Sequence, residues 1–538
     1  MNTKLFLFIT LAFSLISGCA PQTTVATSTA SITATPAPAE PTATPPPRPT
    51  STRTPDPTLK CAAASSRPTI TVDQFIGVNS FNDVPNEVNA VAGILREYHN
   101  WVWDEEIEGQ NKWNPSYASG FWDFDAWYTG LKNNAPPILV SPVIQNNLTG
   151  NEYKPVASGA STTDPNAYAA HASHLYQYAA RYGSVSVPDA TLKLADDQPR
   201  QTGLNLIQYY EDWNEPDKWW AGSSADFSPE EYAAMASADY DGHCQKMGGT
   251  FGVKNADPDA RLVMGGIATG LDLYYLQGIQ SWADAHRNGS LPFDVINFHH
   301  YSTTGKKGIS PEADDLKEEL HKIVAWRDAH APNLEIWYSE FGWDTHPDSP
   351  QAAQEIQPFT IYQVQGQWIV RAYLAALAAG IDRAFQFDIR DGHPSSGTQY
   401  STSGLTWYCD AWSGCREMPD HQNYDPKPSW YYTYTLKHQL TGMIFNGEQD
   451  SENANVLIYT FKGATFGGGA YVLWSPTSNN TTVNDYQLKI RGYPASATLV
   501  TLSDTSPTGD SSPLTITGGT VTVNVSESPI FVLVSSLP

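Results

Sequence analysis

Two glutamates occupy positions from which a pair of carboxyl groups could do chemistry. Glu215 lies in Tyr210-Glu211-Asp212-Trp213-Asn214-Glu215-Pro216, and Glu340 lies in Ile336-Trp337-Tyr338-Ser339-Glu340-Phe341-Gly342-Trp343. Each stands where an apolar, strand-like run ends. Cleavage of a glycosidic bond with retention needs two carboxyl groups, one protonated and one ionised, about 5 to 5.5 Å apart. The pair therefore predicts this chemistry if the fold brings the two side chains together.

The elements between residue 70 and about residue 440 predict a barrel that could do so. Short β-rich runs alternate with helical segments, which favours a (β/α)8 barrel, although a doubly wound open sheet shows the same alternation. In such a barrel the chemistry takes place at the C-terminal strand ends, and we expect Glu215 to close strand four and Glu340 to close strand seven. The expected strands are 75–79, 94–98, 138–143, 206–214, 262–265, 295–301, 335–340 and 383–388, and the expected helices are 228–247, 272–286, 312–329 and 359–379.

The C-terminal part of the chain has a different pattern. Beyond Met443, short alternating strands are separated by turns rich in Gly, Asn and Ser, which predicts an antiparallel β-sandwich. We interpret it as a structural appendage, with carbohydrate binding as the alternative. The predicted fold class is α/β, a (β/α)8 TIM barrel over residues 61–442 followed by a small antiparallel β-sandwich over residues 443–538.

The N-terminal residues predict that the protein is exported and anchored to a membrane by a lipid. Lys4 precedes an apolar run, residues 5–16, that is too short to span a bilayer but suits a signal peptide. Its end, Ile16-Ser17-Gly18-Cys19, resembles the lipobox of bacterial lipoproteins, which implies a lipidated Cys19 after removal of the leader within residues 1–19; an ordinary secretory signal is the alternative. Residues 20–60 are rich in Pro, Thr, Ser and Ala and predict a disordered linker. We expect a protein of the bacterial cell envelope, lipid-anchored at the outer membrane or cell surface, or secreted, whose only membrane contact is that anchor.

Cysteine usage and charge narrow the chemistry further. In an exported protein the four other cysteines predict disulfides; Cys409 with Cys415 is favoured, and pairing of Cys61 with Cys244 stays open. No Cys-x-x-Cys or His-Glu-x-x-His spacing is present, so we expect neither a metal nor a cofactor. The formal net charge of −25 argues against a nucleic-acid partner.

Both glutamate motifs resemble those of a known enzyme clan. Trp213-Asn214-Glu215-Pro216 and Ser339-Glu340-Phe341-Gly342 are similar to the strand-four and strand-seven signatures of the clan A glycoside hydrolases. The resemblance implies that Glu215 is the acid/base, that Glu340 is the nucleophile, and that Asn214 binds the sugar 2-hydroxyl.

Other residues of the predicted site rest on the same resemblance. His299-His300-Tyr301 resembles the clan's His-x-Tyr, so Tyr301 should hydrogen-bond the nucleophile and His299 should orient the site; strand alternation separates His299 from His300, which disfavours a metal. Arg96 resembles the arginine that keeps the nucleophile ionised, with a salt bridge at the barrel rim as the alternative. Aromatic residues that follow the glutamates, and that we consider as stacking platforms for sugar rings, are Trp219, Trp220 and Trp343. Phe387 and Asp388 stand where many clan members carry Trp.

The resemblance also indicates a substrate class. The run from Asn214 to Trp220 and the trailing sandwich resemble family 39, whereas 342–345 and 426–431 resemble endo-β-1,3-glucanase families. We expect a monomeric retaining β-glycoside hydrolase that cleaves an extracellular β-glucan internally. Xylan, mannan or an exopolysaccharide is an open alternative, as is a transglycosylase, which would share every one of these residues. A surface lipoprotein that binds glycans without cleaving them is the non-enzymatic alternative, whereas a serine hydrolase is disfavoured because Gly-x-Ser-x-Gly is absent.

Overall fold

The computed structural model describes residues 56–118, 121–408 and 421–538. The predicted leader with Cys19, most of the predicted linker, and Cys409 with Cys415 lie outside these residues. Contacts divide the chain at Thr52, and the elements below all belong to the unit Arg53–Pro538. No helix in the part of the chain that the structure describes is long and apolar enough to cross a membrane.

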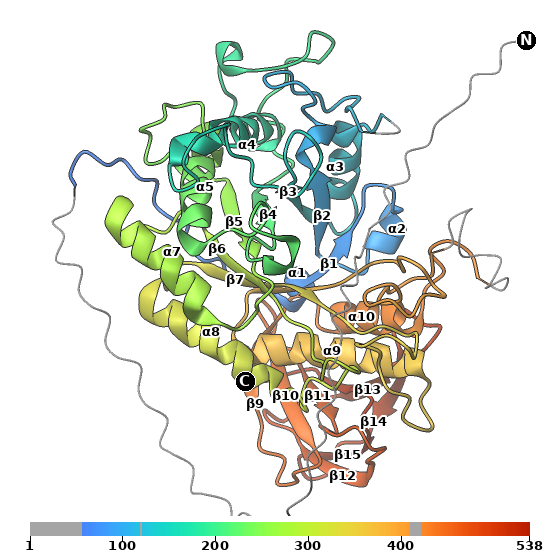
Figure 1. Cartoon of the computed structure of the whole chain (residues 1–538). Helices are drawn as coiled ribbons and strands as arrows, with labels where there is room; N and C mark the ends of the chain where they lie inside the picture. Colours follow the sequence, from blue (N-terminus) through green and yellow to red (C-terminus); the bar gives the residue numbers. More distant parts are fainter. Residues whose placement is uncertain (1–55, 119–120, 409–420) are drawn as a thin grey trace, which may run out of the picture. The chain divides into compact units, whose positions relative to one another are not determined.

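Eight parallel strands close into a barrel in the order β1 to β8, which confirms the predicted fold class (Figure 1). Alternate residues of each strand face opposite sides. Inside the barrel, Tyr209 and Phe385 pack against Trp337 with ring centroids 4.9 and 5.0 Å apart. The opposite faces of the strands pack against the helices in the main hydrophobic core. The barrel strands are β1 (Ile76–Ser80), β2 (Ile94–Asn100), β3 (Leu139–Gln145), β4 (Tyr209–Asn214), β5 (Arg261–Gly266), β6 (Val295–His299), β7 (Glu335–Phe341) and β8 (Arg383–Gln386).

The four predicted helices are present, and side-chain caps at Ser228, Asp272 and Thr360 mark where three of them begin. At the start of α5, Ser228 and Glu231 form a capping box and Pro229 takes the first helical position. Prediction missed several other helices. In one of them, α4, every residue from His171 to Tyr182 is buried, so it has no polar face that would reveal its period. The helices are α1 (Val72–Phe75), α2 (Asn86–Asn89), α3 (Phe124–Lys132), α4 (Ala169–Tyr182), α5 (Pro229–Asp241), α6 (Val253–Ala256), α7 (Leu273–His286), α8 (Leu316–His330), α9 (Ile361–Ala379) and α10 (Pro428–Gln439).

The C-terminal strands form two antiparallel sheets, a six-stranded one and a two-stranded one. Alternation along β10 sends Tyr459 and Phe461 into the core shared with the barrel and Ile458 into a second core between the two sheets. The strands are β9 (Met443–Glu448), β10 (Leu457–Gly463), β11 (Gly469–Trp474), β12 (Val483–Lys489), β13 (Ala497–Thr501), β14 (Asp510–Leu514), β15 (Thr520–Val525) and β16 (Ile530–Val534).

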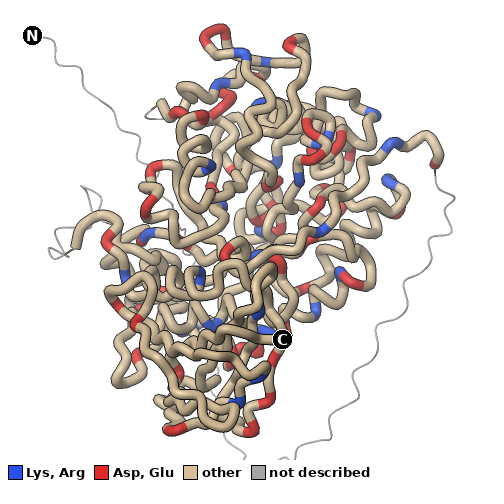
Figure 2. Tube along the Cα trace, turned by 180° about the vertical axis from the view of Figure 1, so that it is seen from behind, with Lys and Arg blue, Asp and Glu red and all other residues tan. Residues whose placement is uncertain are grey.

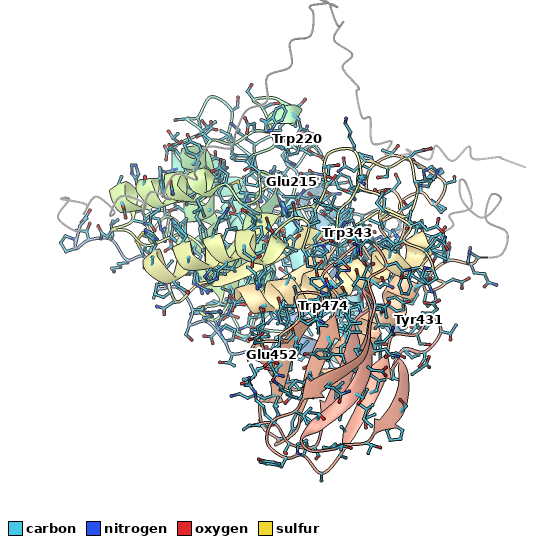
Figure 3. The ribbon with its side chains drawn as sticks, turned by 90° about the horizontal axis from the view of Figure 1, so that it is seen from below. Glu215, Trp220, Trp343, Tyr431, Glu452 and Trp474 are labelled. Carbon is cyan, nitrogen blue, oxygen red and sulfur yellow. A yellow bond between two sulfur atoms is a disulfide. The ribbon has the colours of Figure 1, made fainter. Side chains whose placement is uncertain are left out.

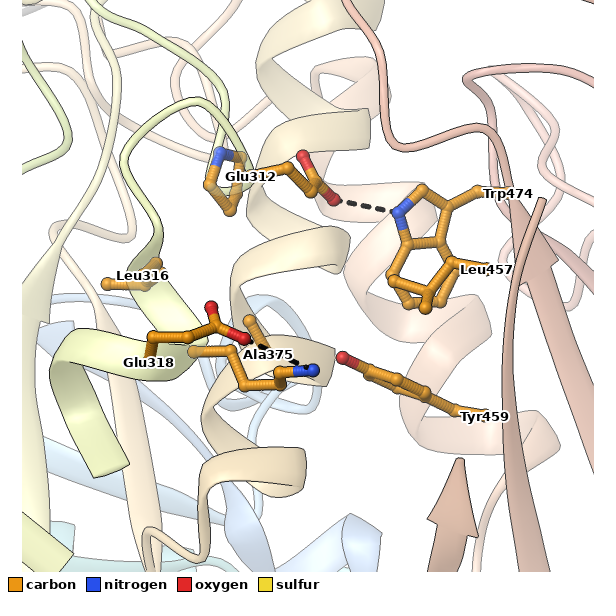
Figure 4. A pocket seen from close by; sticks show the side chains of 9 residues that line it. Glu312, Leu316, Glu318, Ala375, Leu457, Tyr459 and Trp474 are labelled. Carbon is orange, nitrogen blue, oxygen red and sulfur yellow. Dashed lines mark hydrogen bonds and ion pairs between the residues drawn. The ribbon is translucent and has the colours of Figure 1, made fainter. Parts of the chain in front are cut away.

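Polar contacts join this sandwich to the barrel helices. The Trp474 indole donates a 2.7 Å hydrogen bond to Glu312, beside a pocket that Leu457 and Tyr459 also line (Figure 4). The Tyr432 hydroxyl of α10 donates to Asp504 over 2.6 Å. Trp474, the one tryptophan of the sandwich, is thus buried in this contact and presents no ring to solvent.

A disulfide joins Cys61 to Cys244, the pairing that the sequence left open. It connects the segment before the first barrel strand to the residues that follow α5. In the full sequence, acidic residues outnumber basic ones by 56 to 31, and Figure 2 shows acidic positions on both the barrel and the sandwich. A surface of this charge repels polyanions such as nucleic acids.

Candidate active site

Glu215 and Glu340 meet at the C-terminal mouth of the barrel. Glu215 directly follows the last residue of β4, and Glu340 is the sixth residue of β7. One carboxylate oxygen of Glu215 and one of Glu340 lie within 4.8 Å of each other, and a nitrogen of His299 lies within the same distance of both. The barrel therefore brings together the two carboxyl groups that the sequence singled out.

Two local distortions turn these side chains toward each other. Trp213 and Glu215 have left-handed backbone, with φ of 81° and 48°, a conformation that costs energy for residues other than glycine and is frequent at functional sites. The distortion breaks the alternation of β4 and moves the Trp213 ring out of the barrel, where it packs edge-on against Phe227. In β7 the pairing register shifts between Tyr338 and Phe341, which brings Glu340 to the barrel interior.

Glu340 is surrounded by hydrogen-bond donors. Its Oε1 accepts from Arg96 Nη1 at 2.7 Å and from the Tyr98 hydroxyl, and its Oε2 accepts from the Tyr301 hydroxyl at 2.9 Å. Burial alone would raise the pKa of Glu340, but the charges of His299 and Arg96 and the two tyrosine hydroxyls together lower it below its usual value. The site is therefore built to hold Glu340 as a carboxylate.

Arg96 is fully buried inside the barrel, so it is not a salt bridge at the rim. Its Nε and Nη2 bind both oxygens of Glu211, at 2.8 and 2.7 Å, and the same Nη2 donates to the Asn214 amide oxygen at 2.8 Å. A bidentate pair of this kind fixes the plane of the guanidinium. Asn79 adds a further acceptor at 2.9 Å. Glu211 thereby positions the Arg96 guanidinium, which contacts Glu340.

Glu215 has fewer partners than Glu340. Its side chain is 24% exposed, against 7% for Glu340, and its hydrogen bond among the described residues runs to His299 Nδ1 at 3.1 Å. The other ring nitrogen of His299 lies 3.4 Å from Glu340 Oε1. The imidazole thus bridges the two carboxyl groups. Gly266 makes room for it, because a side chain at that position would overlap the ring.

No family model matches the chain, and no curated protein does. Several solved structures do match the chain. A family 39 glycoside hydrolase from Bacteroides cellulosilyticus WH2 is 15% identical with a TM-score of 0.58, and the match covers 87% of this chain and 82% of that one. A family 30 endoxylanase from Clostridium papyrosolvens C71 is 12% identical with a TM-score of 0.51, over 89% of this chain and 98% of that one. The chain has the fold of these glycoside hydrolases. Sequence reasoning had placed it in the same clan.

The three predicted aromatic platforms differ in how exposed their rings are. Trp219 and Trp220 are 69% and 54% exposed and follow Glu215 closely in the chain, so their rings are free to contact a ligand. Figure 3 labels Trp220 together with Glu215. Trp343 is only 1% exposed, and its indole nitrogen donates to the Ile309 carbonyl at 2.9 Å. The stacking role expected for Trp343 is wrong, because its ring points into the core behind the barrel.

Sequence reasoning missed several residues of the site. Tyr98 and Glu211 follow the inward alternation of β2 and β4, and this periodicity could have revealed them. Phe387, which the sequence did single out, lies edge-on to both Tyr98 and Tyr400, with centroids 6.2 and 5.9 Å apart, and so packs against the tyrosine that contacts Glu340. The neighbouring Asp388 is nearly buried, and burial raises the pKa of its carboxyl well above the usual range.

Two groups of side chains in the described ranges have the donor types of a metal site. One comprises Glu215, His299 and Glu340 themselves. Because the Arg96 guanidinium already neutralises Glu340 at 2.7 Å, a cation there would face a fixed positive charge. We therefore assign no metal to this group. The second group, His171 with Asp212 and Asp239, lies behind the barrel wall.

Proposed function

We propose that the protein is a retaining β-glycoside hydrolase in which Glu340 is the nucleophile and Glu215 the acid/base. The observation that supports this most is the approach of the two carboxyl groups, with oxygens within 4.8 Å of each other. Retaining enzymes separate their carboxyl groups by about 5 to 5.5 Å, whereas inverting enzymes need about 6.5 to 9.5 Å to admit a water molecule.

The unequal surroundings of the two glutamates support the division of roles. Glu340 receives hydrogen bonds from Arg96, Tyr98 and Tyr301, and its pKa is lowered, so it attacks the anomeric carbon as a carboxylate. Among the described residues, Glu215 has no arginine or lysine in contact, and it reaches solvent, where a leaving-group oxygen can meet it.

His299 stands between the two carboxyl groups. Its Nδ1 lies 3.1 Å from Glu215 Oε1 and its Nε2 lies 3.4 Å from Glu340 Oε1, so the ring holds the Glu215 carboxyl beside the nucleophile. In the proposed reaction, Glu215 donates the proton that the leaving oxygen takes.

The reaction then proceeds in two displacements. Glu340 forms a glycosyl ester while Glu215 protonates the departing oxygen. Having given up its proton, Glu215 is a carboxylate and acts as the base that deprotonates the incoming water. Water then attacks the anomeric carbon and restores the original configuration. In this proposal Asn214, whose amide oxygen accepts a hydrogen bond from Arg96, donates to the sugar 2-hydroxyl from its amide nitrogen.

For the substrate we propose an extracellular polysaccharide, with a β-glucan cleaved internally as the first choice and xylan, mannan or an exopolysaccharide as alternatives. The exposed Trp219 and Trp220, which follow Glu215 in the chain, suit stacking on sugar rings. A lipidated Cys19 and the Pro-rich linker would hold the enzyme at the bacterial envelope, and transfer to a sugar acceptor would use the same residues.

Substitution of each glutamate tests the assignment. Glu340→Ala should abolish turnover of an aryl β-glycoside, and added azide should restore it with a glycosyl azide of inverted configuration as product. Glu215→Ala should retain turnover of substrates with activated leaving groups and lose it for poor ones. Unchanged turnover in Glu340→Ala, or equal loss for all leaving groups in Glu215→Ala, would contradict the roles. Wild-type protein that binds polysaccharides without cleaving any of a broad panel would favour a glycan-binding lipoprotein instead.

A further inference from the structure

A second cluster of carboxyl and imidazole groups lies on the outer side of β4, away from the candidate active site. It comprises Asp212 of β4, His171 in the first turn of α4, and Asp239 near the end of α5. His171 Nδ1 lies 2.9 Å from Asp239 Oδ2 and 4.0 Å from Asp212 Oδ1. All three side chains are completely buried. The cluster thus connects one barrel strand to two of the helices that cover it.

The charges and hydrogen bonds of this cluster are incomplete. Among the described residues, neither oxygen of Asp212 has a hydrogen-bond partner, and the same is true of Asp239 Oδ1 and His171 Nε2. Within the same residues, His171 is the only ion-pair partner within 4.0 Å of either carboxyl, and no Lys or Arg is so placed. An isolated buried carboxylate costs several kcal/mol unless a cation or hydrogen bonds compensate it.

We propose that His171, Asp212 and Asp239 bind one divalent metal ion. One donor atom from each residue lies within 4.8 Å of the other two. Donors that surround an ion at about 2.0 to 2.2 Å stand about 3 to 3.5 Å apart, so small movements of these side chains would complete the site. A 2+ charge would satisfy the two carboxylates that the protein leaves unpaired.

The donor set indicates which ion. One imidazole nitrogen with two carboxylates suits Zn²⁺ or Mn²⁺, whereas Ca²⁺ prefers oxygen donors alone. The rings of Trp101 and Trp213 lie 5.1 and 5.8 Å from the His171 ring and shield the cluster from solvent. Such an enclosure favours a structural ion that the substrate does not reach.

The position of the cluster gives the ion a role in the fold. Asp212 is three residues before Glu215, and between them lies Trp213 with its left-handed backbone. An ion on Asp212 would fasten this distorted strand end to α4 and α5, and so hold the carboxyl of Glu215 in place.

Metal content tests the proposal directly. The protein is produced with a tag that contains no histidine, incubated in turn with Zn²⁺, Mn²⁺ and Ca²⁺, desalted, and measured by inductively coupled plasma mass spectrometry. We expect one equivalent of Zn²⁺ or Mn²⁺ per chain, with Asp239→Asn and His171→Gln binding none. Glu340→Gln is the matched control, because it disrupts the other three-residue group, and it should bind the ion as wild type does.

Three results would overturn the proposal: a wild-type content below about 0.1 equivalent for all three ions, retention of the metal by Asp239→Asn, or its loss from Glu340→Gln. The first would show that the two aspartates share a proton instead. If the cluster variants do not fold, anomalous diffraction from wild-type crystals soaked in the bound metal decides. A peak in contact with all three side chains supports the site, and a peak elsewhere or none rejects it.

Discussion

Replacing Tyr301 by Phe removes one hydrogen bond to the proposed nucleophile and little else. The Tyr301 hydroxyl donates to Glu340 Oε2 at 2.9 Å, and among the residues described this is the one hydrogen bond that Oε2 receives. The ring packs against Tyr400 with centroids 5.0 Å apart, and Phe retains that contact. The variant should therefore fold normally with a changed ionisation of Glu340.

The size of the change follows from the charge on the acceptor. A hydrogen bond to an ionised group contributes about 1.5 to 3 kcal/mol, and one pKa unit corresponds to about 1.4 kcal/mol. The lost donor should raise the pKa of Glu340 by about one to two units, since Arg96 and Tyr98 still contact Oε1. The acidic limb of the kcat/KM profile reports the free enzyme, so it should move to higher pH by the same amount.

The assay is the pH dependence of kcat/KM, measured from acidic to mildly alkaline pH on an aryl β-glycoside that the wild-type enzyme cleaves. Tyr338→Phe is the matched control. Tyr338 is a buried tyrosine of β7 whose hydroxyl donates to the His300 carbonyl at 2.6 Å and does not contact Glu340. An acidic limb that stays in place in Tyr301→Phe, or that moves equally in Tyr338→Phe, would show that the Tyr301 hydroxyl does not set the ionisation of Glu340.

Two further predictions concern the bridging histidine and a buried histidine behind the barrel. Gly266→Ala places a methyl group against the His299 ring, so kcat should fall at least tenfold while the melting temperature changes by only a few degrees; full activity would show that the ring position is unimportant. Burial lowers the pKa of His99, but Asp104 and Glu97 more than offset this and raise it to about 10. Because that pKa exceeds the unfolded value of 6.5, the stabilisation is complete below about pH 6.5 and is lost as the pH rises toward 10. Denaturant unfolding of wild type and His99→Gln should differ most below about pH 6.5 and converge by about pH 10; a constant difference would contradict the assignment.

The barrel could be predicted because its strands are short apolar runs separated by amphipathic helices. The glutamates could be placed because strand ends coincide with the ends of those runs. Tyr301 was assigned to the same strand face as His299, but β6 ends at His299, so Tyr301 contacts Glu340 from the residues that follow the strand. Helix α4 was missed since its polar side chains are buried on all sides. The pairing of Glu211 with Arg96 could not be predicted. It joins β4 to β2 across the barrel, and no local sequence pattern encodes such a contact.

The exposure of Trp343 could not be predicted from its position directly after a strand end. Such a position suggests exposure at the barrel mouth, but the register shift in β7 turns the ring into the core. Strand periodicity, which makes the barrel predictable, does not report such irregularities. The same holds for Trp213 and Glu215, whose left-handed backbone the sequence does not reveal.

The central claim is that Glu215 and Glu340 act together with retention of configuration. The most direct measurement is ¹H NMR of the anomeric proton of the first product, recorded before mutarotation, during cleavage of a β-linked substrate by the wild-type enzyme. Approach of the two carboxyl groups to within 4.8 Å predicts that the β-anomer forms first. Initial formation of the α-anomer would contradict the account, because inversion requires a water molecule between two more distant carboxyl groups.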